Sequence, residues 1–292
     1  MLMNPTVRKA PALADVVISV KNVSHAYAQG AVKTLNDVSL DIGRGEMVCL
    51  IGPSGCGKST LLNIIGGLVA PSTGEVLVDG KAINGPSPKS IGFVFQENTL
   101  FPWSTIVENV VTALEFQGVP KAERLGRAQA ALDNVGLADF RNSYPHQLSG
   151  GMKQRASLAR ALALETDVIL MDEPFAALDE QTRTYLGEEL SYLLADTKKT
   201  IVMVTHSLGE AVFLSDRVVV MTARPAAIKS IIEVDYPHPR DPDFMMSPHF
   251  SELRNEIYAL LRDEIRQTVG GLVGRAAGRD RSKGDRPVRV VE

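Results

Sequence analysis

The chain has 292 residues, enough for one large domain or two small ones with a sizeable core. Its 31 basic residues stand against 34 acidic ones, a formal net charge of −3, so nothing in the charge balance points to nucleic acid as a partner. With 45% hydrophobic residues and only two cysteines, Cys49 and Cys56, the composition excludes a disulfide framework and is typical of a globular protein in a reducing compartment.

The first residues and the distribution of apolar runs bear on location. Residues 1–15 contain no long apolar segment of the kind found in signal peptides, and we expect them to form a flexible leader. No run of eighteen apolar residues occurs, so we do not expect the chain itself to span a membrane. The expectation is a soluble cytosolic protein.

Short β-rich runs dominate the first hundred residues. They are separated by polar residues or glycine, and they cover residues 16–27, 31–42, 46–52, 74–83 and 89–96. The run at 46–52 is followed by glycines and then by an apolar helical pattern. The sequence therefore predicts a mainly β layer with one embedded strand–loop–helix unit.

The pattern changes to helix after Trp103. Helices are predicted over residues 104–118, 120–136 and 152–165, the first two ended by glycine. The continuous apolar run at 167–174 predicts a buried parallel strand. After it come a helix at 181–197, a strand at 200–206, a second helix and a strand at 217–223. This alternation predicts a parallel α/β core, into which the helical stretch from about 98 to 160 is inserted.

Three segments are predicted beyond the main domain of residues 16–236. Prolines mark residues 237–249 as a linker, and an amphipathic helix with Phe250, Leu253 and Ile257 on one face follows up to about residue 269. Residues 270–292 are rich in glycine and arginine, and we expect a disordered tail.

The stretch Gly52-Pro53-Ser54-Gly55-Cys56-Gly57-Lys58-Ser59 matches the pattern G-x-x-x-x-G-K-[ST] between a predicted strand and a predicted helix. Glycines let backbone N–H groups turn toward phosphate oxygens, and the start of the helix adds its positive dipole end. Lys58 can neutralise phosphate charge, and the Ser59 hydroxyl can ligate Mg²⁺. The alternative, a glycine-rich turn before an ordinary helix, does not explain the lysine. The loop indicates a nucleotide site.

Three further features carry chemistry. Asp172 and Glu173 end a predicted strand, where one carboxylate can hold Mg²⁺ through water and the other can deprotonate an attacking water. Ser149 can cap a helix, and the glycines in the first turn of that helix leave backbone amides open to an anion. A capped helix that binds no ligand is an equally good interpretation. His206 ends the next strand and can sense a γ-phosphate, although a lone histidine is often only packed or solvated.

Taken in order, these motifs resemble those of the ATP-binding cassette (ABC) ATPases, the motor subunits of ABC transporters, over about residues 16–235. Gly52–Thr60 matches Walker A, Val168–Glu173 matches Walker B and Leu148–Gln154 matches the signature sequence. The resemblance implies a P-loop NTPase fold of the ABC-cassette type, α/β in class, with a RecA-like parallel-sheet core, an N-terminal antiparallel β layer and an inserted α-helical subdomain. Met152 and Ala176 depart from the residues commonest in the family, but neither removes a phosphate ligand or the base.

The resemblance also implies roles for single residues. It implies nucleotide contacts for Tyr27, Gly52, Pro53, Ser54, Gly55, Cys56, Gly57, Lys58, Ser59, Thr60, Ser149, Gly150, Gly151 and Asp179, catalytic roles for Gln96, Glu173 and His206, and Mg²⁺ ligation by Ser59, Gln96 and Asp172. Without it, Tyr27 would be assigned to the core. ATP and Mg²⁺ are the implied cofactors, and hydrolysis to ADP and phosphate is the implied reaction.

In this family ATP lies between two cassettes, so the resemblance implies a second copy of the chain as partner. It also implies two transmembrane permease subunits, an extracytoplasmic solute-binding protein that acts indirectly, and a peripheral place on the cytoplasmic face of the cell membrane. Phe101 and Trp103 are the candidate permease contacts, with local packing as the alternative.

The "PW" at 102–103 and the stretch at 210–241 are similar to importers of nitrate, sulfonates, taurine and related small anions. Three alternatives remain open at this point: a cassette of another transporter branch, one of an exporter or lipid-handling complex, and an ABC ATPase of DNA repair or ribosomes. The last class usually carries two cassettes, a coiled-coil insertion or zinc-binding cysteines, and this sequence has none of them.

Overall fold

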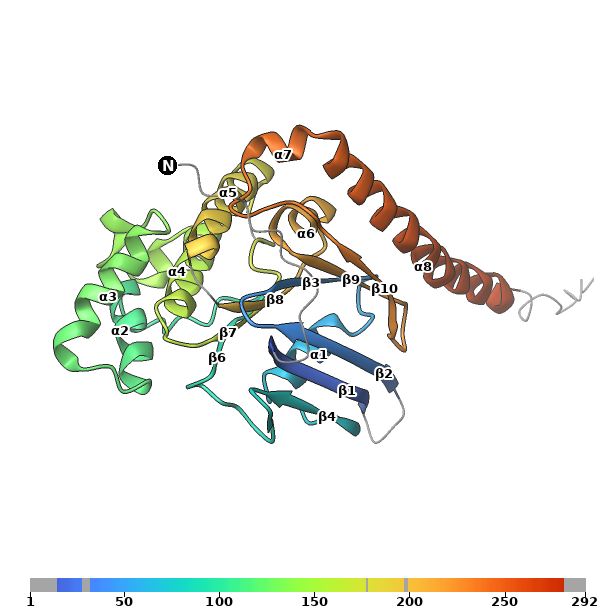
Figure 1. Ribbon diagram of the computed structural model, residues 1–292, viewed down its shortest axis with the longest axis horizontal. Coiled ribbons are helices and arrows are strands. Elements are labelled where there is room, and N and C mark those ends of the chain that lie inside the picture. The colour runs from blue at the N-terminus through green and yellow to red at the C-terminus, as the bar shows by residue number, and fades with distance from the viewer. Residues whose placement is uncertain (1–14, 28–31, 177, 197–198, 281–292) are drawn as a thin grey trace, which may run out of the picture.

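Two β-sheets with helices between and around them form the molecule in the computed structural model (Figure 1). The structure describes residues 15–27, 32–176, 178–196 and 199–280. Residues 1–14 of the predicted leader and 281–292 of the predicted tail lie outside it.

The N-terminal sheet is antiparallel. Among the described residues its strand order is β2-β1-β4-β5, with β1 (Val16–Tyr27), β2 (Val32–Gly43), β4 (Thr73–Val78) and β5 (Lys81–Ala82). Val20 pairs with Leu40 on one side and with Val76 on the other. Alternation of apolar and polar residues along β1 buries one face of this sheet, as expected of an antiparallel sheet with one solvated side.

The central sheet is mainly parallel and confirms the predicted α/β core. Its order among the described strands is β10-β9-β3-β8-β7-β6, and all neighbours are parallel except β10 and β9. The bounds are β3 (Met47–Ile51), β6 (Ile91–Val94), β7 (Val168–Asp172), β8 (Thr200–Val204), β9 (Arg217–Met221) and β10 (Ile228–Glu233). Strands β3, β7 and β8 are buried along their whole length, which explains their unbroken apolar sequences.

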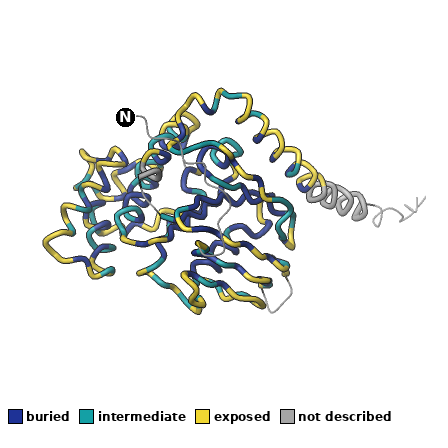
Figure 2. The backbone as a smooth tube through the Cα atoms, in the orientation of Figure 1, coloured by how far each residue is buried: buried dark blue, intermediate teal, exposed yellow. Residues whose placement is uncertain are grey.

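Alternate residues of these strands belong to two separate cores. One core joins the central sheet to helix α1 (Lys58–Ile65) and the N-terminal sheet, and it contains Val48, Leu50, Val202, Val204 and Val219. The other joins the central sheet to the helices on its opposite face, and it contains Cys49, Ile51, Ile201, Met203 and Val220. Helix α1 is therefore fixed between two sheets, and buried residues concentrate along the central strands (Figure 2).

Three helices between β6 and β7 form the inserted subdomain, α2 (Ile106–Phe116), α3 (Lys121–Asp133) and α4 (Gly150–Leu162). Short 3₁₀ turns at Ala138–Phe140 and Pro145–Gln147 precede α4. A capping box begins α2: the Thr105 side chain accepts from Glu108 N, and the Glu108 carboxylate accepts from Thr105 N. Gly118 ends it with a φ of 85°. Local sequence thus sets both ends of α2.

The C-terminal part consists of α5 (Glu180–Asp196), α6 (Leu208–Leu214), α7 (Pro242–Met246) and α8 (Pro248–Asp280). The proline-rich segment predicted as a linker packs against the core instead, because Arg240 and Phe244 are both fully buried. The Arg240 guanidinium donates to the carbonyls that end α6, including Val212 O at 2.7 Å. Helix α8 continues to Asp280, past the expected end near residue 269, although the added stretch contains four glycines, which disfavour helix.

Candidate active site

The glycine-rich loop links β3 to α1 and has the backbone that its sequence requires. Gly57 has a φ of 136°, and a Cβ there would lie 2.9 Å from Leu35 Cδ2, so only glycine fits. Ser54 and Gly55 are exposed, whereas Gly52, Pro53 and Cys56 are buried. The outer part of the loop is therefore accessible to a ligand, and its base is part of the core.

Lys58 lies inside this loop. Its side chain is buried, and Nζ donates to Gly52 O at 2.9 Å and to Pro53 O at 3.1 Å. Burial lowers the pKa of the ammonium, and the nearby carboxylates of Glu173 and Asp172 partly oppose that shift. A desolvated cation at the start of a helix is a strong site for phosphate oxygens.

Asp172 reaches the same loop from the end of β7. Ser59 Oγ donates to its Oδ1 at 3.0 Å, across 113 residues of sequence. The Asp172 carboxyl is buried, and this burial raises its pKa. Strands β3, β8 and β7 are adjacent and parallel, so their carboxyl ends bring the residues that follow them to one edge of the sheet (Figure 1).

Glu173 is the centre of a group of three predicted residues. Its Oε1 lies 2.8 Å from His206 Nε2, and its Oε2 accepts from Gln96 Nε2 at 3.2 Å. Glu173, His206 and Gln96 follow three different strands, β7, β8 and β6 respectively. The carboxylate side chain is 15% exposed and that of His206 45% exposed, so one side of the group is open. A carboxylate fixed at both oxygens next to a phosphate loop is suited to act as a general base.

Tyr27 lies at the end of β1 beside α1. Its hydroxyl is 3.4 Å from Thr60 Oγ1, and its ring meets His25 edge to face at 4.6 Å. The residue is 44% exposed, so it is not the core residue that its sequence alone would suggest. The ring can stack on a ligand bound at the loop.

The remaining predicted contacts lie elsewhere in the chain. Ser149 caps α4 by accepting from Met152 N at 3.3 Å, with Gly150 and Gly151 in the first turn, and Asp179 caps α5 by accepting from Thr182 N at 2.9 Å. Among the described residues, no hydrogen bond or ion pair joins these caps to residues 52–60. Within the described part of one chain, the predicted phosphate loop and the predicted signature segment are therefore not joined by a hydrogen bond or ion pair.

Arg224 is a site residue that the sequence analysis missed. It lies in the turn between β9 and β10, and its Nη2 donates to Gly55 O at 2.6 Å. Strand β9 is the other neighbour of β3, so its carboxyl end lies at the same edge of the sheet. A basic residue just beyond such a strand was the available signal.

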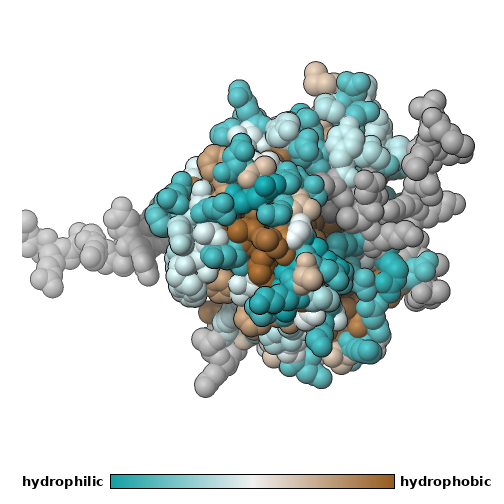
Figure 3. All heavy atoms as spheres, turned by 90° about the vertical axis from the view of Figure 1, so that its left-hand side faces the viewer, coloured by the Kyte–Doolittle hydropathy of each residue, from teal (hydrophilic) through white to brown (hydrophobic). Residues whose placement is uncertain are grey.

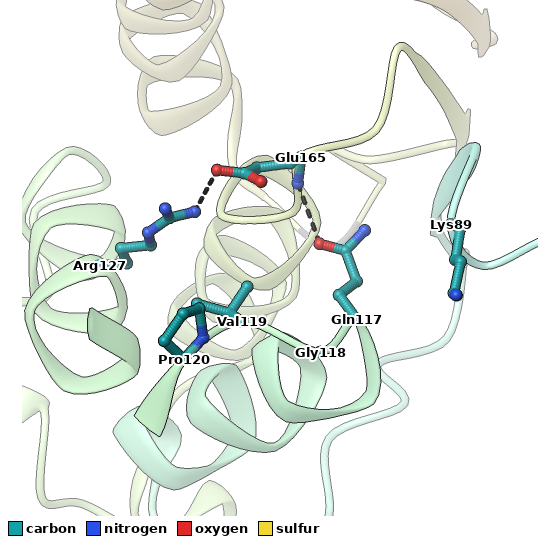
Figure 4. A pocket seen from close by; sticks show the side chains of 7 residues that line it. All are labelled: Lys89, Gln117, Gly118, Val119, Pro120, Arg127 and Glu165. Atoms are coloured by element: carbon teal, nitrogen blue, oxygen red, sulfur yellow. Dashed lines mark hydrogen bonds and ion pairs between the residues drawn. The ribbon is translucent and has the colours of Figure 1, made fainter. Parts of the chain in front are cut away.

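A separate pocket lies between the inserted helices and the central sheet, with a volume of about 260 Å³ (Figure 4). Its lining residues are Lys89, Gln117, Gly118, Val119, Pro120, Arg127 and Glu165. Arg127 pairs with Glu165, and Glu165 N donates to Gln117 Oε1 at 3.0 Å. None of the predicted nucleotide residues is in this lining, and its ion pair joins α3 to the segment between α4 and β7.

Known proteins resemble this chain over most of its length. The sequence model of the ABC transporter family matches residues 35–176. An uncharacterized ABC transporter ATP-binding protein of Methanocaldococcus jannaschii is 47% identical over 87% of this chain and 94% of its own. The bicarbonate transport ATP-binding protein CmpD of Synechocystis sp. is 44% identical over 88% and 92%, and the aliphatic sulfonates import ATP-binding protein SsuB of Bacillus cereus is 41% identical over 83% and 94%.

A solved structure agrees with the fold. The ATP-binding cassette MJ0796, described as a dimer in a post-hydrolysis state bound to ADP and phosphate, superposes with a TM-score of 0.68 at 37% identity. The match covers 74% of this chain and 98% of the other. Within the part of the chain that the structure describes, no helix is both long and apolar enough to cross a membrane.

Proposed function

Since this chain belongs to the ABC transporter ATP-binding family and is an ATPase of that class, we propose that two copies of it drive the import of a small anion through a separate membrane permease. The observation that carries the catalytic part is the contact of Glu173 with both Gln96 and His206, at the sheet edge that also bears the phosphate loop. The import part rests on the named relatives.

ATP phosphates bind along residues 52–60 in this proposal. Backbone N–H groups and Lys58 contact the β- and γ-phosphates, and Tyr27 stacks on the adenine. Ser59 and Asp172 fit Mg²⁺, because they offer hard oxygen donors 3.0 Å apart and because a cation would offset the burial that raises the pKa of Asp172. Gln96 completes the set of metal ligands. When bound, the ion neutralises charge on the phosphates.

Hydrolysis then uses the group around Glu173. The carboxylate accepts a proton from the attacking water, and Gln96 and His206 keep it in one orientation because each contacts one of its oxygens. His206 is also open enough to donate to a γ-phosphate oxygen. The chain thus supplies a base, a positioned water and charge stabilisation from residues at one edge of its sheet.

A second copy completes the site. Ser149, Gly150, Gly151 and Asp179 make no hydrogen bond or ion pair with the phosphate loop of their own chain among the described residues, and α4 presents its positive end at Ser149. A twofold pair places each signature segment opposite the partner's loop and makes two equal sites. ATP then binds the closed pair better than the open pair, which is the requirement for a ligand-driven switch. The dimeric relative supports this arrangement.

The inserted helices provide the permease contact in this proposal. Trp103 is 74% exposed and stacks on Phe101 at 5.5 Å. Buried Asn109 on α2 holds this loop through bonds to Phe101 N and O, at 2.6 and 3.2 Å. The face of the molecule on the side of the inserted helices has an apolar area surrounded by hydrophilic residues (Figure 3). An exposed aromatic anchor suits a protein interface, and an apolar area on the face of the inserted helices supports an interface on this side.

Small anions are the proposed solutes. Two relatives are named for bicarbonate and for aliphatic sulfonates, and the sequence resembles importers of nitrate and taurine as well. In this proposal the permease and the extracytoplasmic binding protein select the solute, and the chain acts at the cytoplasmic face of the membrane without choosing the anion.

The test is to purify the tagged chain from gently solubilised membranes of its own source and to identify what is recovered with it. We expect a polytopic permease, whose binding protein is then screened with bicarbonate, nitrate, sulfonates and taurine. Trp103→Ala should reduce permease recovery several-fold, whereas Phe116→Ala, equally exposed at the end of α2, should not. Recovery of ribosomes or DNA-repair proteins without a permease would contradict the proposed role in import, while the assignment as an ATPase would stand.

A further inference from the structure

Helix α8 is joined to the turn between β9 and β10 by one buried carboxylate. Glu264 is 6% exposed, and its Oε2 accepts from Ala223 N at 2.9 Å. Its Oε1 accepts from Lys229 Nζ on β10 at 2.8 Å, and Lys229 also donates to Leu260 O at 2.9 Å. The apolar face of α8, with Phe250, Leu253, Ile257 and Leu261, is part of the core that also contains Cys49 and Ile51 of β3. The position of Glu264 is therefore fixed by the body of the protein.

The same turn is fixed from the N-terminal sheet. Ala226 N donates to Thr34 O at 2.8 Å, and Asn36 N donates to Ala226 O at 2.9 Å. Between these anchors and the Glu264 contact lies Arg224, whose Nη2 donates to Gly55 O at 2.6 Å. A charged donor at this distance makes a stronger bond than a neutral one.

This bond acts on the backbone that must face phosphate. The peptide unit between Gly55 and Cys56 is planar, and its N–H donates to Pro53 O at 3.2 Å while its oxygen accepts from Arg224. Hydrogen bonds at both edges of this peptide unit, one to the N–H and one to the oxygen, limit the rotation of the unit. Gly55 has a φ of 70°, and glycine adopts positive and negative φ about equally, so its own backbone does not fix the direction of the neighbouring amides and hydrogen bonds must do so.

We propose that Arg224 is a positioning residue for the phosphate loop and that helix α8, through Glu264, sets the turn that carries it. The C-terminal helix thereby tunes nucleotide affinity from outside the nucleotide site. Arg224 also adds a positive charge beside the exposed residues Ser54 and Gly55, where anionic phosphates arrive. This inference rests on the assignment of residues 52–60 as the phosphate loop.

The experiment measures the Kd of trinitrophenyl-ATP and the steady-state KM and kcat for ATP with the full chain. Arg224→Ala should raise both Kd and KM about fivefold, the size expected for loss of one charged hydrogen bond at a partly exposed site, with kcat changed less and Tm unchanged. Arg224→Lys should recover part of the affinity, because it keeps the charge but not the planar fork. An unchanged Kd for Arg224→Ala overturns the role of Arg224.

The link to α8 is tested by Glu264→Gln against Asp263→Asn, an exposed neighbour on the same helix. Glu264→Gln should raise Kd in the same direction by a smaller factor, and Asp263→Asn should not change it. The double variant Arg224→Ala/Glu264→Gln should bind no more weakly than Arg224→Ala alone, because both changes act on one contact. Independent, additive losses overturn the link.

A third variant separates this inference from the proposed function. Lys58→Ala should abolish trinitrophenyl-ATP binding if residues 52–60 bind phosphate. Retained binding in Lys58→Ala contradicts the site itself, whereas lost binding in Lys58→Ala together with unchanged binding in Arg224→Ala contradicts only the positioning role.

Discussion

One residue at the edge of the sheet, Glu173, has an unusual backbone conformation that matches its proposed role. Glu173 has a φ of 48°, which costs a non-glycine residue on the order of 1–3 kcal/mol. Its N–H donates to Val204 O at 2.9 Å, so the sheet offsets part of that cost. The turn of the backbone directs the carboxylate to Gln96 and His206. Asp172, one residue earlier, accepts a hydrogen bond from Ser59 instead.

Changing Glu173 to Gln keeps the shape of the side chain and removes its basicity. We expect Glu173→Gln to bind ATP and to form a stable ATP-dependent dimer, while the turnover rate falls by about 100-fold or more. Phosphate release and size-exclusion chromatography with ATP measure the two effects. Glu97→Gln, an exposed neighbour of Gln96, is the matched control. Hydrolysis at the parental rate by Glu173→Gln would show that the base is assigned wrongly.

Among the secondary-structure elements, α6 and the segment after β10 depend on one buried arginine. Arg240 Nη1 donates to Val212 O, Phe213 O and Ser215 O at 2.7, 3.0 and 2.8 Å. The guanidinium also lies 5.4 Å from the centre of the Phe244 ring. Burial lowers its pKa to about 10, so it stays charged near neutral pH. These bonds satisfy the carbonyls at the end of α6, which lack partners within the helix.

Arg240→Leu removes the donors and leaves those carbonyls buried. We expect it to lower the free energy of unfolding by about 3 kcal/mol, measured by urea denaturation. The exposed Arg254 of α8 provides the control, since Arg254→Leu should change the free energy of unfolding by less than about 0.5 kcal/mol. Equal effects of the two substitutions would mean that Arg240 does not anchor this segment.

The two kinds of element differ in how well sequence predicts them. Strands β3, β7 and β8 were predicted within two residues of their observed ends, because burial on both faces leaves an unbroken apolar run. Strand β10 was not predicted. It pairs antiparallel with β9 at one edge of the sheet, and its half-exposed residues give a weak pattern. The segment at 237–249 was predicted as a linker because prolines interrupt regular structure, but Pro242 and Pro248 each begin a helix, and proline content does not determine burial.

At the level of the assembly, the proposed dimer divides each site between two copies. The phosphate loop and Glu173 occupy one edge of the central sheet, whereas Ser149 begins a helix of the inserted subdomain. A chain with one defective half-site can therefore be complemented by a chain with the other defect.

Mixing two inactive variants tests this arrangement. Lys58→Ala and Ser149→Arg should each have almost no ATPase activity alone. In a mixed dimer both defects fall on one site and the other site is intact, so an equal mixture should recover roughly a quarter of parental activity if pairing is random. Phosphate release before and after mixing gives the measurement. No recovery, with both variants folded by circular dichroism, would mean that each chain uses only its own residues.

Sequence patterns alone predicted the glycine-rich loop, the strand that precedes Asp172 and Glu173, and the capped start of α4. Each of these is a local pattern, in which backbone geometry or burial restricts the residue type over a few neighbouring positions. Three features became visible only in the folded chain: Arg224 bonds to Gly55 across 169 residues, Glu264 accepts from Ala223 in the turn beside it, and Arg240 is buried. Such contacts leave no period or spacing in the sequence, because they arise only when the ends of adjacent strands and a distant helix are brought together by the packing of the core.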